Sequence, residues 1–357
     1  MSAAMNTPSA AEVNVLNDTQ QQSEGVWHAA WRRFKTDRVG FASMLIVAVF
    51  LLVILLAALG LVAKEWQREL GVPNAPPTLL GPAAAQAKSV IEAPTGPNVD
   101  LSDIDPLAPR YKEWEERAKL FATTETVKAL TLPLGADRLG RDVLDKAIKG
   151  TQVSVFVGVL AALVATLIGT VLGAIGGFYG GKVGDFLEWA YNVIEAIPNI
   201  LLIFAIAAAL NQRGVTNVVL ILGLTGWAGM YRQVRAEFIK HSSREYVRAA
   251  EAIGATATSR IFKHILPNVS HVVLVRMSLL VVGFIKAEVI LSYLGLGVPV
   301  DQVSWGTMLA EAQSELILGH WWQLMAATVF MAVFVTAFSL MADALRDALD
   351  PKLRGLE

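Results

Sequence analysis

The chain has 357 residues, of which 54% are hydrophobic and only 17% are charged, with a mean hydropathy of +0.49 and a net charge of -1. This composition is too apolar for an ordinary soluble protein and is typical of a polytopic membrane protein, and the near-neutral charge argues against a nucleic-acid partner. The absence of cysteine excludes a disulfide framework and thiolate chemistry, and the five histidines lie far apart, so no metal site is predicted.

The first part of the chain predicts a tail, a surface helix and a membrane span. Residues 1–24 are rich in Ala, Ser, Asn and Gln, which is typical of a disordered tail. Within residues 25–39, Trp27, Trp31 and Phe34 recur at helical spacing beside four cations, so we expect an amphipathic helix with its rings in the membrane interface. Residues 40–63 carry no charge and are long enough to cross a bilayer as an uncleaved first span.

Five more apolar segments predict an all-α transmembrane bundle of six spans. They lie at residues 152–179, 186–210, 217–232, 269–294 and 321–345. The second span carries small residues at four-residue intervals, a pattern that lets helices approach closely in lipid. These residues are Gly169, Gly173, Gly177 and Gly181.

Short flanking segments indicate the orientation, because Lys and Arg accumulate on the cytoplasmic side. Cations precede the first span, follow the second and the sixth, and are densest between the fourth and the fifth, where Arg232, Arg235, Lys240, Arg244, Arg248, Arg260 and Lys263 lie. The opposite side has only Arg213 in its short loops. Both termini are therefore expected to be cytoplasmic.

The segment from residue 64 to residue 151 is then external. Prolines are concentrated between Pro73 and Pro109, which predicts irregular structure there, and residues 110–122 fit a surface helix. Residues 132–150 have one apolar side and are expected to form a helix at the outer interface before the second span. Trp305, Trp321 and Trp322 suit an outer aromatic belt.

Ionisable residues within the spans are candidates for the translocation path. Glu195 lies one turn before Pro198, which is expected in mid-helix, although Glu195 could instead lie near the cytoplasmic interface. Lys286 and Glu288 fall near the middle of the fifth span and diverge on a helix, so they are not expected to pair with each other. Arg276 is close enough to the cytoplasmic end to reach the interface. We therefore take Glu195, Pro198, Lys286 and Glu288 as path candidates.

Residues 244–268 predict a helix-turn-helix between two spans. Ser242 followed by Glu245 has the spacing of a capping box, and Gly254 is expected to end the first helix in the left-handed conformation. Thr256 or Thr258 can cap a second short helix, and Pro267 is placed to end it.

This stretch resembles the EAA loop of ABC import permeases. Ala249, Ala250, Gly254, Leu266 and Pro267 stand at the matching spacing, while Arg248 replaces the name-giving Glu and His264 replaces an Ile. Either Glu245 or Glu251 could then take the part of the missing acid. The resemblance implies that coupling to an ATPase involves Glu245, Arg248, Ala249, Ala250, Glu251, Gly254, Leu266 and Pro267.

Three further stretches resemble the DppC/OppC branch of these permeases, which handles peptides and nickel. They are the LPLGADRLGRDVL segment at 132–144, the LSYLGLG and SWGTML segments between 291 and 309, and the tail MADALRDALDPKLR at 341–354. The resemblance implies a MetI-like permease core at residues 152–345 with a coupling loop at 232–268, a cytoplasmic tail at 346–357 and a multi-pass place in the bacterial inner membrane.

The same resemblance implies a non-enzymatic subunit with no cofactor of its own. Its expected partners are a second, related permease, two cytoplasmic ATPase subunits that bind ATP and an extracytoplasmic binding protein. Two other functions stay open on the residues alone, an ion-coupled secondary carrier and a membrane-anchored binding or sensor protein. Dipeptides, longer peptides, glutathione, opines and nickel chelates all remain possible substrates.

Overall fold

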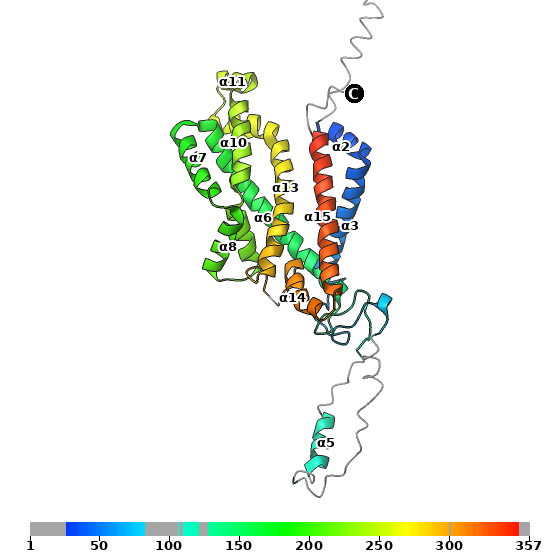
Figure 1. The fold of residues 1–357 in the computed structure, drawn as a ribbon. Helices are drawn as coiled ribbons and strands as arrows, with labels where there is room; N and C mark the ends of the chain where they lie inside the picture. Colours follow the sequence, from blue (N-terminus) through cyan, green and yellow to red (C-terminus); the bar gives the residue numbers. More distant parts are fainter. Residues whose placement is uncertain (1–25, 83–105, 107–109, 121–127, 300, 350–357) are drawn as a thin grey trace, which may run out of the picture. The chain divides into compact units, whose positions relative to one another are not determined.

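A computed structural model describes residues 26–82, 106, 110–120, 128–299 and 301–349 (Figure 1). Its regular elements are helices, and the described residues form isolated β-bridges but no strand. The helices are α2 (Val26–Thr36), α3 (Arg38–Ala58), η1 (Thr78–Leu80), α5 (Tyr111–Leu120), α6 (Val143–Tyr179), α7 (Gly181–Glu195), α8 (Asn199–Leu210), α9 (Val215–Thr225), α10 (Ala228–Ser242), α11 (Glu245–Ala252), α12 (Ala257–Ser259), η3 (Arg260–Ile265), α13 (Leu266–Tyr293), α14 (Trp305–Ile317) and α15 (Trp322–Leu349). The expectation of an all-α protein is confirmed.

The chain divides into two compact units. Unit 1 contains Met1–Leu52, Val155–Glu288 and Ala332–Glu357, and unit 2 contains Val53–Ser154 and Val289–Met331. Unit 1 holds α7 to α12, and unit 2 holds α5 and α14. Each unit has its own buried clusters of apolar side chains.

Three described helices, α3, α6 and α15, are long and apolar enough to cross a membrane. A fourth candidate is the pair α7 and α8, which is bent by 83° at its break, and α9 is apolar but has only 11 residues. The first, second and sixth predicted spans therefore coincide with suitable helices. The fifth coincides with the 28-residue α13, which ends before Gly295 at a φ of +77°. The count of six spans stays a prediction.

The third and fourth predicted spans are not single helices. Pro198 is not in mid-helix, because α7 ends at Glu195 and α8 begins at Asn199, with Pro198 as its N-cap. In the fourth, α9 ends at Thr225 and α10 begins at Ala228. Apolar residues lie on both sides of each break, so hydropathy alone did not show that these spans are interrupted.

In unit 1 the small residues of α6 lie directly against α10. A Cβ added at Gly169, Gly173 or Gly177 would lie 2.6–2.8 Å from atoms of α10, including the carbonyl oxygens of Trp227, Tyr231 and Arg235. The predicted packing role is confirmed for these three residues. Gly181 is different, because it starts α7 at a φ of +50° and a Cβ there would meet nothing within 4 Å.

In the amino-terminal helix α2, the ring of Phe34 does not lie where the sequence predicted. Trp31 is 46% exposed and stacks on Phe34 with ring centroids 5.9 Å apart. Phe34 is buried, packing with Ala344, Ala348 and Leu349 of α15. It therefore belongs to the core of unit 1 rather than to the membrane interface. The predicted tail at 1–24 lies outside the described residues.

In unit 2 the expected interfacial helix at 132–150 is replaced by a turn followed by the first turns of α6. Gly135 and Gly140 both have a φ of +84°, which interrupts a helix, and Asp142 accepts a hydrogen bond from the backbone N–H of Leu144 at 2.7 Å, which starts α6. The predicted surface helix at 110–122 is confirmed as α5.

The expected aromatic belt is wrong for two of its three residues. Trp305 and Trp322 are buried, and the indole N–H of Trp322 donates to the carbonyl oxygen of Ala136 at 2.6 Å. Only Trp321, 44% exposed, is available to an interface. Burial with a hydrogen-bond partner is the other common setting of a tryptophan, and the sequence does not distinguish the two.

We expect Gly173→Ala to lower the unfolding temperature of the purified protein in detergent. The added methyl group would lie 2.8 Å from the carbonyl oxygen of Tyr231, and overpacking of this kind costs about 1–3 kcal/mol. Gly283→Ala in α13 is the matched control, because its Cβ would meet nothing within 4 Å and alanine is the better helix former. Equal unfolding temperatures for the two variants would contradict the close packing of α6 on α10.

Candidate coupling and translocation sites

The helix-turn-helix forms as predicted at its centre. Helix α11 ends with Ile253 as C-cap, and Gly254 follows with a φ of +85°. The N–H of Gly254 donates to the carbonyl of Glu251, and the N–H of Ala255 donates to that of Ala250, both at 2.9 Å. This is the Schellman arrangement, which requires a left-handed residue at the position of Gly254. Thr256 caps the next helix by accepting from the N–H of Ser259 at 3.3 Å.

Both outer ends of the motif differ from the prediction. The N-cap of α11 is Arg244, and the Ser242 hydroxyl donates to the carbonyl of Ile239 instead of forming a capping box. Pro267 does not end the second helix, because α12, the π-helical η3 and α13 follow one another without a gap. Pro267 lies in the first turn of α13, where a missing backbone N–H is tolerated after the change from π to α pairing.

One ion pair joins the two arms of the motif. The Arg260 guanidinium lies 2.6 Å from the Glu251 carboxylate and stacks over the ring of Phe178, 5.2 Å from its centroid, at the end of α6. Glu251 is therefore the acid that makes a contact within the motif, while Glu245 at the start of α11 is exposed. Because Glu251 is largely exposed, the pair orients the arms more than it stabilises the fold.

Apolar packing fixes the motif to α10 and α13. Val247 of α11 and Ile261 and Ile265 of η3 are buried in one cluster with Met230, Val234 and Phe238 of α10 and Val269 of α13. Leu266 packs against the same cluster, and Ala250 is also buried. Side chains on a shared apolar core move together, so this motif is a rigid extension of α10 (Figure 1).

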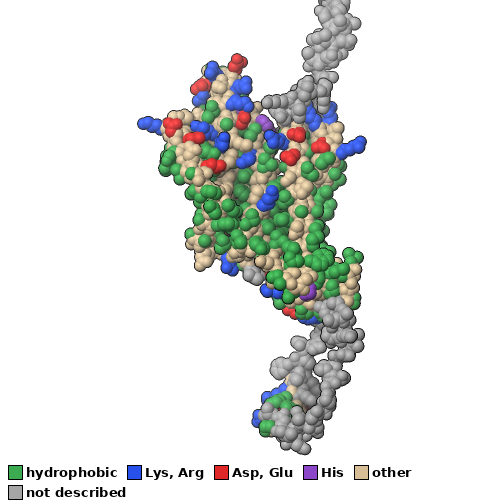
Figure 2. Space-filling model, in the orientation of Figure 1, with side chains coloured by type: hydrophobic (Ala, Val, Ile, Leu, Met, Phe, Trp, Pro, Cys, Tyr) green, Lys and Arg blue, Asp and Glu red, His purple; other side chains and the backbone are tan. Residues whose placement is uncertain are grey.

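The outer face of the motif combines exposed apolar and charged side chains. Ile253 is 85% exposed and Phe262 59% exposed, close in sequence to the exposed Arg248, Ala249 and Pro267. Figure 2 shows charged side chains gathered around α10 and α11, and hydrophobic ones over parts of unit 1 further from them. Large apolar side chains exposed on such a charged end are typical of a protein-binding surface.

A cavity of about 300 Å³ lies where the two helix breaks of unit 1 face α13. Its lining includes Glu195, Pro198 and Asn199 at the first break, Gly226 and Gly229 at the second, and Arg276. Two of the four path candidates, Glu195 and Pro198, are thus brought together. Lys286 is exposed and Glu288 fully buried, and neither lines this cavity.

Arg276 lines the cavity, although the sequence pattern did not single it out as a path candidate. Its side chain also lines a second cavity of about 240 Å³ with Gln233, His271 and Arg346. A Cβ added at Gly229 would lie 2.5 Å from Nη2 of Arg276, so the guanidinium rests on the start of α10. Small residues at 226 and 229 next to an intramembrane cation were the available signal.

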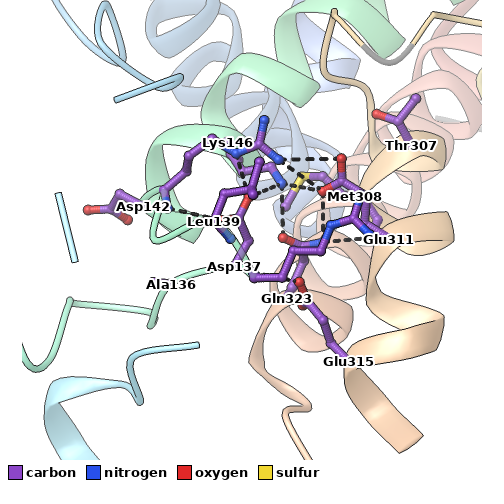
Figure 3. A network of polar contacts seen from close by, with 12 residues as sticks. Ala136, Asp137, Leu139, Asp142, Lys146, Thr307, Met308, Glu311, Glu315 and Gln323 are labelled. Atoms are coloured by element: carbon purple, nitrogen blue, oxygen red, sulfur yellow. Dashed lines mark hydrogen bonds and ion pairs between the residues drawn. The ribbon is translucent and has the colours of Figure 1, made fainter. Parts of the chain in front are cut away.

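Unit 2 contains a buried network of charges around Lys146 (Figure 3). The ammonium group lies 2.7 Å from Asp137, 2.5 Å from Glu311 and 3.0 Å from the amide oxygen of Gln323. Lys146 and Asp137 are almost completely buried. Arg141 adds a second cation, with its Nε 2.6 Å from Asp137. Sequence reasoning missed this network because it joins α6 to residues about 170 positions away.

The cations of the network lower the pKa of the Asp137 carboxyl group. Burial raises the pKa of Asp137, but the charge and hydrogen bond of Lys146 and the backbone N–H and charge of Arg141 outweigh burial and hold that pKa below its usual value. Asp137 is therefore ionised at neutral pH. Burial raises the pKa of Glu315, which accepts the backbone N–H of Arg138 at 2.9 Å.

Two family models match the chain. Residues 165–355 match the binding-protein-dependent transport system inner membrane component, and residues 25–77 match the N-terminal transmembrane domain of oligopeptide transport permease C. The first match covers α7 to α15 and residues 165–179 of α6. The chain belongs to the binding-protein-dependent transport permeases.

Individual permeases are similar over most of their length. The chain is 31% identical over 252 residues to the oligopeptide transport system permease protein OppC of Bacillus subtilis, which covers 69% of this chain and 80% of that protein. It is 33% identical over 220 residues to the dipeptide transport system permease protein DppC of the same organism, covering 62% and 68%. It is 39% identical over 223 residues to OppC of Salmonella typhimurium, covering 62% and 72%.

Membership of this permease family fixes the general function. The chain is a permease subunit of an ABC importer, and it belongs to transport proteins, which are not enzymes. Such permeases are inner-membrane components that work with ATPase and binding-protein partners. The family favours this function over the ion-coupled carrier and the membrane-anchored sensor.

We expect Lys146→Met to destabilise the permease by about 3 kcal/mol near neutral pH, because it leaves buried carboxylates with fewer cations. In the wild type the contribution of Asp137 is complete above about pH 4 and is lost as the pH falls through its lowered pKa. The difference between wild type and variant should therefore shrink on acidification. Denaturation in detergent at several pH values measures it.

Lys149→Met is the control for Lys146→Met. Lys149 lies one turn further along α6 and hydrogen-bonds only to Gln152, at 2.7 Å, among the interactions of the described residues. It should change stability by less than about 1 kcal/mol at every pH. A similar loss in both variants would show that the network does not hold unit 2 together.

Proposed function

We propose that the chain forms the translocation path of an importer for peptides or a related small solute, by alternating access driven by ATP hydrolysis in partner subunits. The relatives that carry dipeptide and oligopeptide in their names support the substrate class. The observation that carries the mechanism is the helix-turn-helix, whose inner face is packed on α10 and α13 and whose outer face exposes Ile253 and Phe262.

We infer that this motif receives the movement of the ATPase. Glu245, Arg248 and Ala249 are exposed on α11, while Ala250 is buried, so the outer residues are available to a partner and the inner one fixes the lever. Glu251 holds the two arms through Arg260, and Gly254 sets the angle between them. Leu266 and Pro267 begin the helix that leads to the cavity.

The finer organisation follows from the same proposal. The coupling loop at 232–268 and both termini lie in the cytoplasm, the segment 64–151 lies outside, and the permease core spans 152–345. The complete importer pairs this chain with a second, related permease, two ATPase subunits and one binding protein. Glu195, Pro198, Lys286 and Glu288 are the path candidates, with Lys286 exposed on α13 where a second permease could cover it.

We expect Gly254→Val to uncouple ATP hydrolysis from uptake in the complete complex. A β-branched residue at a φ of +85° costs more than 1 kcal/mol of backbone strain, although a Cβ there meets nothing within 4 Å, so the turn angle changes rather than the packing. Proteoliposomes with the purified complex and its binding protein should show ATP hydrolysis with at least tenfold less uptake per ATP. Copurification with the ATPase subunits is measured in the same preparation.

Gly254→Asn is the matched variant, because asparagine enters the left-handed region most easily among the other residues. It should keep most of the uptake per ATP. Normal coupling in Gly254→Val would contradict the lever. Transport by the chain in liposomes without any ATPase would contradict the proposed function itself.

A further inference from the structure

The cavity of unit 1 is bordered by the ends of four helices. Helix α7 ends at Glu195 and α8 begins at Asn199, while α9 ends at Thr225 and α10 begins at Ala228. Each of these four ends contributes its terminal residue to the lining of the cavity: Glu195, Asn199, Thr225 and Ala228. Interrupted helices at membrane depth are tolerated where they line a cavity, and their ends carry partial charges that can bind ions.

The start of α8 can offer backbone N–H groups to a ligand. Its N-cap is Pro198, and no side chain caps it. The first N–H groups of a helix lack intrahelical partners. Here those of Leu201 and Leu202 donate to the carbonyl oxygen of Pro198 at 2.9 and 3.1 Å, so the N–H groups of Asn199 and Ile200 are the ones available to a ligand. The 12-residue α8 is long enough to place a positive partial charge at this end.

Arg276 gives the same cavity a full positive charge. Its Nε is buried and has no hydrogen-bond partner among the described residues. Its guanidinium rests on Gly229, where only a hydrogen atom leaves enough room. A buried donor without a partner costs free energy, and a ligand carboxylate that accepts from a guanidinium would recover it.

Glu195 gives the cavity a negative charge that forms no ion pair with Arg276. No ion pair within 4.0 Å involves either side chain among the described residues, although both line one cavity of about 300 Å³. Two opposite charges that share a small space without meeting leave a gap for a molecule that has both charges. Leu202, Leu280 and Phe284 add apolar side chains to the lining of the same cavity.

We propose that this cavity is a recognition site for a zwitterionic solute, with its carboxylate on Arg276 and the start of α8 and its ammonium group on Glu195. The permease would then recognise the two charged ends of a short peptide, in a step separate from its recognition by the binding protein. A volume of about 300 Å³ is at the small end of ligand sites, which fits a compact solute. This inference rests on the proposed import function and names the solute class and contacts.

The test uses the complete complex of both permeases and the ATPase subunits in nanodiscs, without binding protein. Three probes are the dipeptide Ala-Ala, its N-acetyl derivative and its C-terminal amide, and the readout is the concentration that gives half of the maximal thermal stabilisation. Wild type should prefer Ala-Ala over both derivatives by about tenfold or more, because each derivative loses one charge-assisted contact.

The variants separate the two ends of the solute. Arg276→Gln should abolish the preference for the free acid over the amide, while leaving the preference for the free amine. Glu195→Gln should do the reverse. Arg276→Lys keeps the charge and should retain part of the preference, and Gly229→Ala should weaken it by displacing the guanidinium. Lys182→Gln, an exposed cation on α7 outside the cavity, is the control and should change nothing.

Several results would overturn the proposal. One is a wild type that is not stabilised by Ala-Ala, or that is stabilised equally by all three probes. Another is a folded Arg276 variant with the full preference for the free acid. If the complex copurifies and couples ATP hydrolysis to uptake while these results occur, the recognition site alone is wrong. If the chain does not copurify with ATPase subunits, the proposed function fails.

Discussion

The close approach of α6 to α10 is the contact on which the organisation of unit 1 depends. Three glycines bring the backbones of the two helices together, so α10 has little freedom to shift on α6. One end of α10 borders the cavity at Ala228 and Gly229, and its last turns lead to the helix-turn-helix. Its 15 residues cover about 22 Å at the usual helical rise. A helix that is straight and held along its side transmits a displacement over that distance.

Helix α13 also connects the helix-turn-helix to the cavity. Val269, near its start, is buried in the cluster that fixes the helix-turn-helix, and Arg276, Leu280 and Phe284 further along line the cavity. The two helices meet again at the cavity, where the Arg276 guanidinium rests on Gly229. A force applied to the motif would therefore reach both walls of the cavity together. This geometry suits the proposed alternating access, in which the walls of the cavity move relative to the broken helices α7 and α8.

Hydropathy located the apolar helices well, because a segment that crosses a bilayer needs a high average hydrophobicity. It did not locate the breaks at 196–198 and 226–227, since apolar residues continue through them and one proline is compatible with either a kink or an end. Gly254 could be predicted because a left-handed turn selects one residue type locally. Arg276, Trp305 and Lys146 could not be placed, because their surroundings come from segments distant in the sequence. The resemblance to import permeases found the helix-turn-helix, but only the contacts showed that Glu251, and not Glu245, is the acid tied to Arg260.

Two groups of charged side chains differ in how far their charges are compensated within the protein: the buried network around Lys146, and the cavity that the half-buried Arg276 and the exposed Glu195 share. Around Lys146 the ammonium group has three oxygen partners, and Asp137 accepts from two cations and from backbone N–H groups, so the desolvation of each charge is compensated within the protein. Such a network has nothing left to offer a ligand, and its role is to hold α6, α14 and α15 of unit 2 in one register. Around Arg276 the opposite holds, because a cation and an anion share a cavity without compensating each other. Opposite charges that line a cavity without pairing can both bind a charged ligand. The first arrangement stabilises the fold, whereas the second leaves both charges available to the proposed zwitterionic solute.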